Sequence, residues 1–183
     1  MDQDQKKKLL IGIWSGAAAL LVLAAGLVMY MLNNPTYYNS QFKFSLSYPA
    51  KWKKFENFQG APVCFIRPKK TALDTFEANV NVSVQEVPDH IATLSSFSDT
   101  INKQMTGVFG PNILVLMDKD VRFANRPGHQ MVFQGAKPAD MKLLFVWTIK
   151  GSIAYIFTFA AQEKQYKDEL PVVQKMIDSF QLK

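Results

Sequence analysis

Few residues of this 183-residue chain are of the types that catalysis needs, and none forms a recognised catalytic motif. Cys64 is the only cysteine, and His90 and His129 are the only histidines. Cys64 lies between Val63 and Phe65 in an apolar segment, which favours a buried, inert thiol over a nucleophile. Each histidine adjoins a predicted turn, a position more typical of surface residues than of acid–base catalysts. We therefore predict no catalytic residue, and an enzyme acting through Cys64 or a histidine is the unfavoured alternative.

Two carboxylates could in principle bind a metal ion. Asp118 and Asp120 stand on either side of Lys119, in a segment that we predict to be a turn. Hard cations prefer oxygen ligands, but two carboxylates do not complete a coordination shell, and the lysine between them opposes cation binding. We predict a solvated turn with no metal and no cofactor. A metal or small-ligand carrier that uses this turn and His90 remains a second alternative.

The charge distribution argues against nucleic acid as a partner. The chain carries a formal net charge of +6, and without residues 1–8 the charge of the remainder is +5. Its lysines and arginines are scattered among acidic residues and form no long run, whereas nucleic-acid-binding proteins concentrate basic residues on one face. We expect a mildly cationic, solvated surface.

A membrane anchor is the clearest prediction for the N-terminal part. Leu9–Leu32 contains no charged residue, and 24 residues in a helix extend for about 36 Å, which exceeds a hydrocarbon core of about 30 Å. Residues 6–8 are all lysine, whereas Asn33–Gln41 carries no positive charge. By the positive-inside rule, residues 1–8 form a cytoplasmic tail and the rest of the chain lies outside the cytoplasm. We expect a single-pass protein of a bacterial inner membrane, either cytoplasmic or thylakoid.

Two alternatives concern this segment. A cleaved signal peptide would use the small residues Ala24, Ala25 and Gly26, but the apolar run continues past them to Leu32, which favours an uncleaved anchor. Gly12 and Gly16 form a small-xxx-small pair of the kind found where two membrane helices approach closely, so a homodimer stays open without further support.

Residues 33–40 are polar and predict a linker to a single domain over residues 41–183, long enough to form its own core without a disulfide. The clearest strand is Glu77–Val87, where apolar and polar residues alternate without interruption. Further strands are predicted at Phe42–Tyr48, Val63–Arg67, Ile113–Met117, Arg122–Ala124, Gln130–Phe133, Lys142–Ile149 and Ile153–Ala160.

Helical spacing appears twice, from Leu94 to Met105 after an N-cap at Thr93 or Ser95, and from Glu163 to Phe180, where Pro171 predicts a kink or a new start. Because strands and helices do not alternate regularly, the fold class is α+β, an antiparallel sheet flanked by helices.

Five motifs in order resemble those of PsbP-like domains. They are Phe42–Trp52, which fits a strand followed by Tyr-Pro-x-x-Trp; the valine strand Asn79–Val84; the turn Asn125–Gln130; the strand Gly151–Phe159; and the helix end Ile177–Phe180. The resemblance covers residues 41–183 and implies the α/β/α sandwich shared by extrinsic photosystem II subunits and a Ran-binding yeast protein. Members of that fold mostly dock to larger complexes. The resemblance therefore implies a binding or assembly module on a membrane protein complex, with a photosystem as one such complex, and it transfers no binding residue.

Overall fold

The computed structural model describes residues 22–71, 74–88, 93–110, 113–135 and 140–183. The chain divides into two units, residues 1–35 and residues 36–183. In the first unit, residues 22–33 are helical and the large apolar side chains among them are exposed. No helix within the described ranges combines the length and apolar character needed to cross a membrane. The tail 1–8 and residues 9–21 of the expected anchor lie outside the described residues, so the anchor stays a prediction.

The second unit is built on a seven-stranded antiparallel sheet with the order β3-β4-β5-β9-β8-β7-β6. Its strands are β3 (Lys53–Phe58), β4 (Ala61–Ile66), β5 (Asn79–Glu86), β6 (Leu114–Phe123), β7 (Arg126–Gln134), β8 (Met141–Lys150) and β9 (Ile153–Gln162). β8 and β9 form the expected hairpin, in which Gly151 adopts a positive φ of 64° that an L-residue with a side chain rarely adopts. The antiparallel α+β architecture agrees with the prediction.

A second, three-stranded sheet contains β1 (Thr36–Asn39), β2 (Phe44–Ser47) and β10 (Gln181–Leu182), with β2 in the middle. The expected linker at residues 33–40 therefore includes a strand. Thr36 pairs with Ser47 and Asn39 with Phe44, and Tyr37 packs into the core, so the folded unit begins before residue 41. A four-residue strand directly after Pro35 is too short to show alternation, and pairing with β2 provides the backbone partners that the sequence pattern does not reveal.

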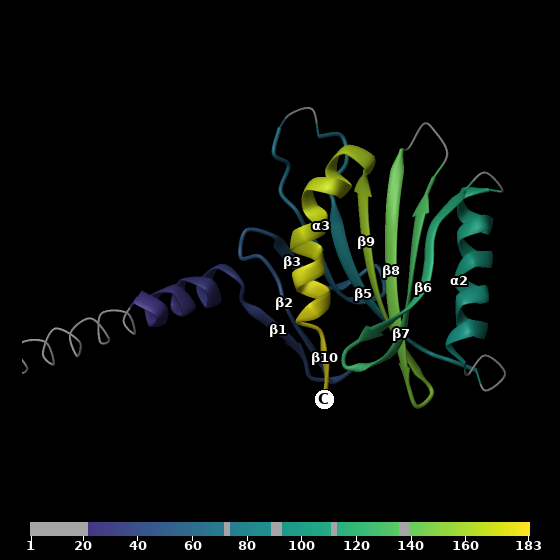
Figure 1. Ribbon diagram of the computed structural model, residues 1–183, viewed down its shortest axis with the longest axis horizontal. Helices are drawn as coiled ribbons and strands as arrows, with labels where there is room; N and C mark the ends of the chain where they lie inside the picture. Colours follow the sequence, from purple (N-terminus) through teal and green to yellow (C-terminus); the bar gives the residue numbers. More distant parts are fainter. Residues whose placement is uncertain (1–21, 72–73, 89–92, 111–112, 136–139) are drawn as a thin grey trace, which may run out of the picture. The chain divides into compact units, whose positions relative to one another are not determined.

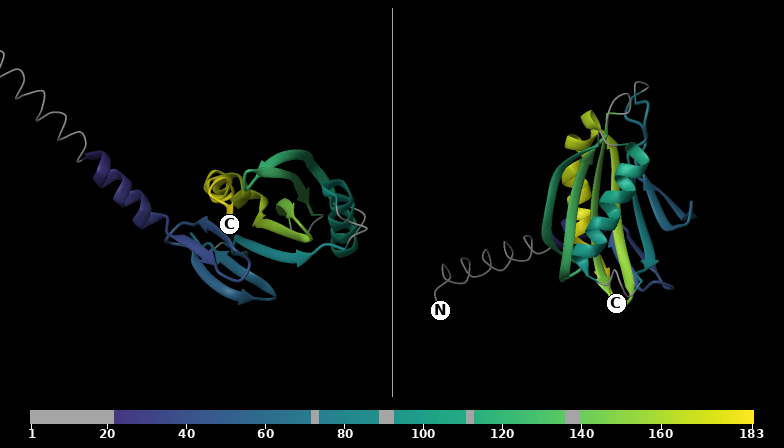
Figure 2. Two further views of the ribbon diagram at one scale, coloured as in Figure 1. Left: turned by 90° about the horizontal axis from the view of Figure 1, so that it is seen from below. Right: turned by 90° about the vertical axis from the view of Figure 1, so that its right-hand side faces the viewer.

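Two helices cover opposite faces of the large sheet (Figures 1 and 2). α2 (Leu94–Phe109) begins after Thr93, whose hydroxyl accepts a hydrogen bond from the backbone N–H of Ser96, as the N-cap prediction requires. α3 (Glu163–Asp178) is a single helix that contains Pro171, so the expected new helix start near Leu170 is wrong. A chain with two helices on the two faces of an antiparallel sheet forms three layers.

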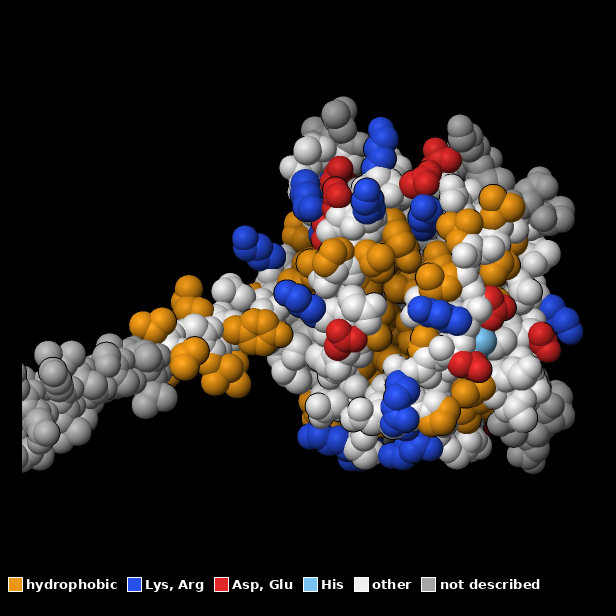
Figure 3. Space-filling view, viewed as in Figure 1, with side chains coloured by type: hydrophobic (Ala, Val, Ile, Leu, Met, Phe, Trp, Pro, Cys, Tyr) orange, Lys and Arg blue, Asp and Glu red, His pale blue; other side chains and the backbone are white. Residues whose placement is uncertain are grey.

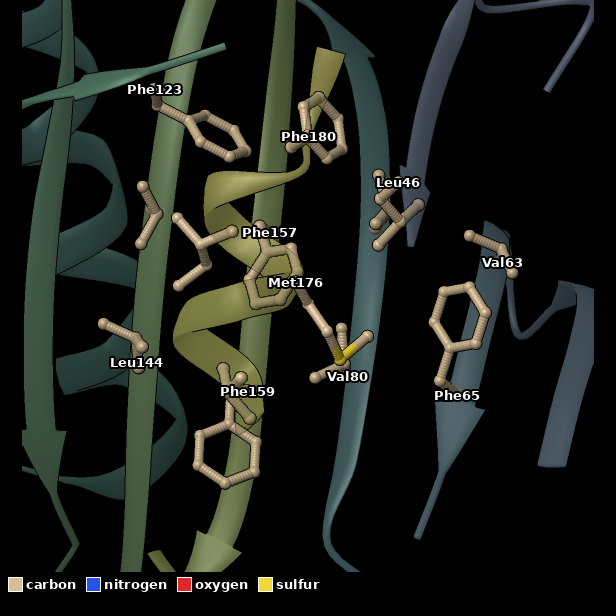
Figure 4. Packing of buried hydrophobic residues seen from close by; sticks show 14 of the residues in the cluster. Leu46, Val63, Phe65, Val80, Phe123, Leu144, Phe157, Phe159, Met176 and Phe180 are labelled. Atoms are coloured by element: carbon tan, nitrogen blue, oxygen red, sulfur yellow. The ribbon is translucent and has the colours of Figure 1, made fainter. Parts of the chain in front are cut away.

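Each face of the sheet has its own core because side chains alternate along the strands. On β8, Leu144 and Val146 join the cluster under α3, whereas Phe145 and Trp147 join the cluster under α2. Figure 4 shows the α3 side, where Met176 points from the helix toward Phe157 and Val80 of the sheet. The double cover explains why the central strands are rich in apolar residues on both faces.

Two strand predictions were wrong. The expected turn at Asp118–Asp120 does not exist, because β6 runs without a break from Leu114 to Phe123 and pairs with β7 along its whole length, apart from a bulge at Leu116. β3 was not predicted at all, because five of its six residues are exposed and burial therefore imposes no alternation on it. Both are edge strands of the large sheet, where no strand among the described residues pairs with one side of the backbone.

Candidate functional site

A prominent feature of the surface of the second unit is the apolar first half of β6. Leu114, Val115, Leu116 and Met117 are consecutive, and each side chain is 38 to 59 % exposed. Scattered exposed apolar residues are normal on a protein surface, whereas a run of consecutive exposed apolar residues is a candidate interaction site. The sequence predicted a strand at these positions but not its exposure.

A groove of about 400 Å³ runs along the same strand, between β6 and α3. Its apolar lining comes from Leu116 and Met117 on β6, Val132 on β7, and Tyr166 and Leu170 on α3. Figure 3 shows these apolar side chains gathered between α3 and β6, with basic side chains around them. The bulge at Leu116 allows two consecutive residues of β6 to line one groove, which a regular strand would place on opposite faces.

On the other face of β6, two carboxylates flank the ring of His129. Asp120 lies opposite His129 in the β6–β7 register, and its Oδ1 is 2.8 Å from Nδ1 of the ring. Oδ1 of Asp118, two residues along the strand, is 2.6 Å from Nε2. A neutral imidazole donates from one nitrogen only, so the doubly protonated ring is the form that donates to both carboxylates. The ring also packs on Trp147, with centroids 5.0 Å apart.

This cluster does not converge on a point where a cation could bind. The two carboxylates contact opposite nitrogens of one ring, and across the described ranges no group of three or more His, Cys, Asp or Glu side chains could hold a metal ion. Asp118 and Asp120 lie in a strand and not in the turn on which the carrier alternative depends. His90, its other residue, lies outside the described residues.

Cys64 is buried on β4, as the sequence predicted, and burial raises the pKa of its thiol to about 11. At neutral pH the thiol therefore carries almost no thiolate, the nucleophilic form. Three strands, β5, β9 and β8, lie between β4 and the strand that carries His129. At about 4.8 Å per strand the two residues are roughly 19 Å apart, so they do not form a nucleophile–base pair.

A buried ion cluster joins the end of β4 to α3. The guanidinium of Arg67 lies 2.9 Å from Asp74 Oδ2 and 3.5 Å from Glu169 Oε1, and Lys70 Nζ lies 2.6 Å from the same Glu169 oxygen. The backbone N–H of Lys70 and the nearby Arg67 lower the pKa of Asp74. Arg67 bridges Asp74 and Glu169, and Lys70 also pairs with Glu169, so these contacts tie Arg67, Lys70 and Asp74 to the helix. The sequence pattern does not predict the cluster, because Glu169 is far along the chain from Arg67, Lys70 and Asp74.

The second unit thus combines a three-layer fold with an exposed apolar edge on β6. A family model described as PsbP matches residues 33–182, and the chain belongs to the PsbP family. The match includes β1, in agreement with a folded unit that begins before residue 41.

Solved structures of the same fold come from distant organisms. The solution structure of cyanobacterial PsbP from Synechocystis matches with a TM-score of 0.62 at 14 % identity, covering 82 % of this chain and 93 % of that chain. The Ran-binding protein Mog1p of Saccharomyces cerevisiae matches with a TM-score of 0.59 at 8 % identity, covering 82 % and 95 %. LpqN of Mycobacterium tuberculosis, described as involved in cell envelope biogenesis, matches at 0.55 and 8 % identity, covering 81 % and 90 %. A search of curated proteins gives no match.

Proposed function

We propose that this chain is a membrane-anchored, extracytoplasmic binding module that docks onto a membrane protein complex of a bacterial inner membrane. The observation that carries the docking role is the contiguous exposed apolar surface of β6, from Leu114 to Met117, beside the groove under α3. Such a surface is costly to leave in water and is typical of a site that a partner covers.

The anchor in this proposal rests on the sequence. The uncharged run Leu9–Leu32 follows three lysines, so the helix would hold residues 1–8 in the cytoplasm and the PsbP domain on the other side. Anchoring confines the domain to the membrane surface and raises its concentration near a membrane-embedded partner without any new contact. The match to the PsbP family makes a photosystem-related complex the first partner to test in a photosynthetic host.

Two measurements on native membranes test the proposal. After a carbonate wash at pH 11, an anchored chain stays in the membrane pellet, and recovery in the supernatant would refute the anchor. After mild solubilisation, the epitope-tagged chain is expected to migrate with a membrane complex in a native gel. Migration as the free chain under every mild condition would refute the docking role.

A further inference from the structure

Within the described part of the chain, the outer edge of β6 is open from Leu114 to Asp120. β7 pairs with one side of the strand from Leu114 to Phe123, and within the described part of the chain no strand pairs with the other side. Residues 114–120 are all exposed. An edge of this kind presents backbone N–H and C=O groups that another extended chain can pair with.

The opposite edge of the same sheet is protected. β3 carries Lys53, Lys54 and Glu56 on its six residues, and within the strand Asn57 adopts a positive φ of 53°. Edge lysines and backbone irregularities discourage pairing with further strands, since an added strand would have to bring its backbone against charged side chains. The first four residues of β6 carry no charge at all. Leu114–Met117 therefore provides an uncharged stretch of edge that β3 lacks, and the bulge at Leu116 and the charged residues from Asp118 onward mark its limits on β6.

The groove beside β6 indicates the charge of its occupant. Besides apolar side chains it is lined by Lys119 and Lys142, and none of its lining residues is acidic. Lys142 pairs with Glu163 at 3.1 Å, whereas Lys119 forms no ion pair with any described residue. Asp118 and Asp120 lie on the other face of β6, where both carboxylates contact the ring of His129. A carboxylate on the groove side would complement Lys119, and Glu163, which lies next to the lining residue Lys142, is already paired with that lysine.

We propose that β6 binds an extended acidic–apolar segment of a partner protein as an additional β-strand. The segment pairs its backbone with the open edge, sets alternate apolar side chains over Leu116 and Met117, and directs a carboxylate toward Lys119. This mode is strand addition, in which backbone hydrogen bonds supply affinity and the side-chain groove supplies selectivity. The inference rests on the proposed docking function and names the surface and the partner chemistry for it.

A second copy of this chain fits the edge less well. In a symmetric antiparallel pair of β6 strands, the residue on the two-fold axis faces itself. The ten-residue strand overlaps with its copy most completely when the two-fold axis passes through Asp118 or Lys119. The first register places Asp118 opposite Asp118 and the second places Lys119 opposite Lys119, and like charges directly opposite each other are destabilising. The charge pattern of β6 therefore favours a different polypeptide.

The test compares two matched substitutions in the full-length chain in its native membrane. Leu116→Lys changes an apolar side chain that is 48 % exposed on the open edge, and Phe55→Lys changes one that is 40 % exposed on the protected edge. The wild type and Phe55→Lys are expected in the larger assembly on a native gel. For Leu116→Lys we expect a loss of the assembled fraction of about tenfold, as for a central interface residue.

Cross-linking identifies the occupant. A photoreactive amino acid at position 116 is expected to cross-link to a partner segment that mass spectrometry maps as extended, apolar and acidic, and Lys119→Glu is expected to reduce the yield.

Thermal unfolding is the control for folding: every variant is expected to melt within a few degrees of the wild type, and Lys119→Glu remains informative if Leu116→Lys fails to fold. If the wild type assembles and Leu116→Lys assembles equally well, the strand-addition inference is wrong while docking stands. A cross-link to a second copy, or to lipid alone, also overturns it, and a wild type that never assembles refutes the docking function itself.

Discussion

Gly128 on β7 has no room for a side chain. A Cβ atom added there would lie 2.7 Å from the carbonyl oxygen of Trp147 on β8 and 3.0 Å from Cβ of Phe123. Backbone cannot give way as a flexible side chain can, so Gly128→Ala is expected to destabilise the domain by about 1–3 kcal/mol. Thermal unfolding measures the effect.

The matched control is Gly107 in α2, where an added Cβ meets nothing within 4 Å. Gly107→Ala is expected to leave the stability unchanged or to raise it by up to about 1 kcal/mol, because alanine favours a helix over glycine. Equal melting temperatures for the two variants would show that β7 and β8 do not approach as closely as described.

Asp74 gives the domain a pH dependence at low pH. The backbone N–H of Lys70 and the guanidinium of Arg67 lower its pKa in the folded state below the unfolded value of about 3.9. A carboxylate with a lowered folded pKa stabilises the fold above its unfolded pKa, and this contribution is lost as the pH falls through the folded pKa. Asp74→Asn is therefore expected to melt below the wild type at pH 7, with the difference closing below about pH 4. A difference that stays constant down to pH 2 would contradict the lowered pKa.

Residue-level predictions succeeded where the local sequence determines the environment. Cys64 is flanked by Val63 and Phe65 in an apolar strand, and these apolar neighbours were enough to predict a buried thiol. The contacts of His129 were not predictable, because Asp118 and Asp120 approach it only through the β6–β7 register. Three polar residues in succession favour a turn by propensity, and pairing with β7 overrides that preference.

At the level of elements, the end of α3 holds the two sheets together. Phe180 stacks on Phe44 of the small sheet at a centroid distance of 5.4 Å and packs against Phe123 of the large sheet at 4.6 Å. The residue itself is 2 % exposed. Figure 4 shows the ring of Phe180 between the small sheet and the large sheet. The closing aromatic of the helix-end motif therefore has a structural role.

Phe180→Ala is expected to cost about 3–5 kcal/mol, since it removes a large buried side chain from a junction of rigid elements. For a domain of this size the melting temperature falls by roughly 10 °C. Phe55→Ala, on the exposed face of β3, is the control and is expected to stay within about 0.5 kcal/mol of the wild type. A small effect at Phe180 would mean that β10 and β2 pair without help from the aromatic contact.

The elements that the sequence predicted best are those with at least one buried face. The alternation of β5 and the helical spacing of α2 arise because one face of each element packs on the core and the other faces water. Both elements lie close to their expected positions. β3 and β6 are edge strands with few buried residues, so their sequences are constrained by backbone pairing and by whatever the edge must bind or repel. The candidate docking surface was missed for the same reason, since exposure of Leu114–Met117 depends on the strand order and not on the local pattern.

For the molecule as a whole, the proposed function combines an anchor with a binding edge. An isolated strand-addition site of modest area binds weakly, because ordering an extended segment costs conformational entropy. Confinement to the membrane compensates for weak affinity by raising the effective concentration of the domain near its partner. The proposal thus requires the domain and its partner surface to lie on the same side of the membrane.

Cysteine labelling tests that orientation. Cys64 is buried and its thiol has a pKa of about 11, so the wild type is expected to resist a membrane-impermeant maleimide and serves as its own blank. In a Cys64→Ser background, Ser40→Cys places a thiol in an exposed turn beside β1, and Gln5→Cys places one in the lysine-rich tail. In intact spheroplasts the thiol at position 40 is expected to react and the thiol at position 5 to react only after lysis. The reverse pattern would place the PsbP domain in the cytoplasm, and a partner outside the cytoplasm would then be out of its reach.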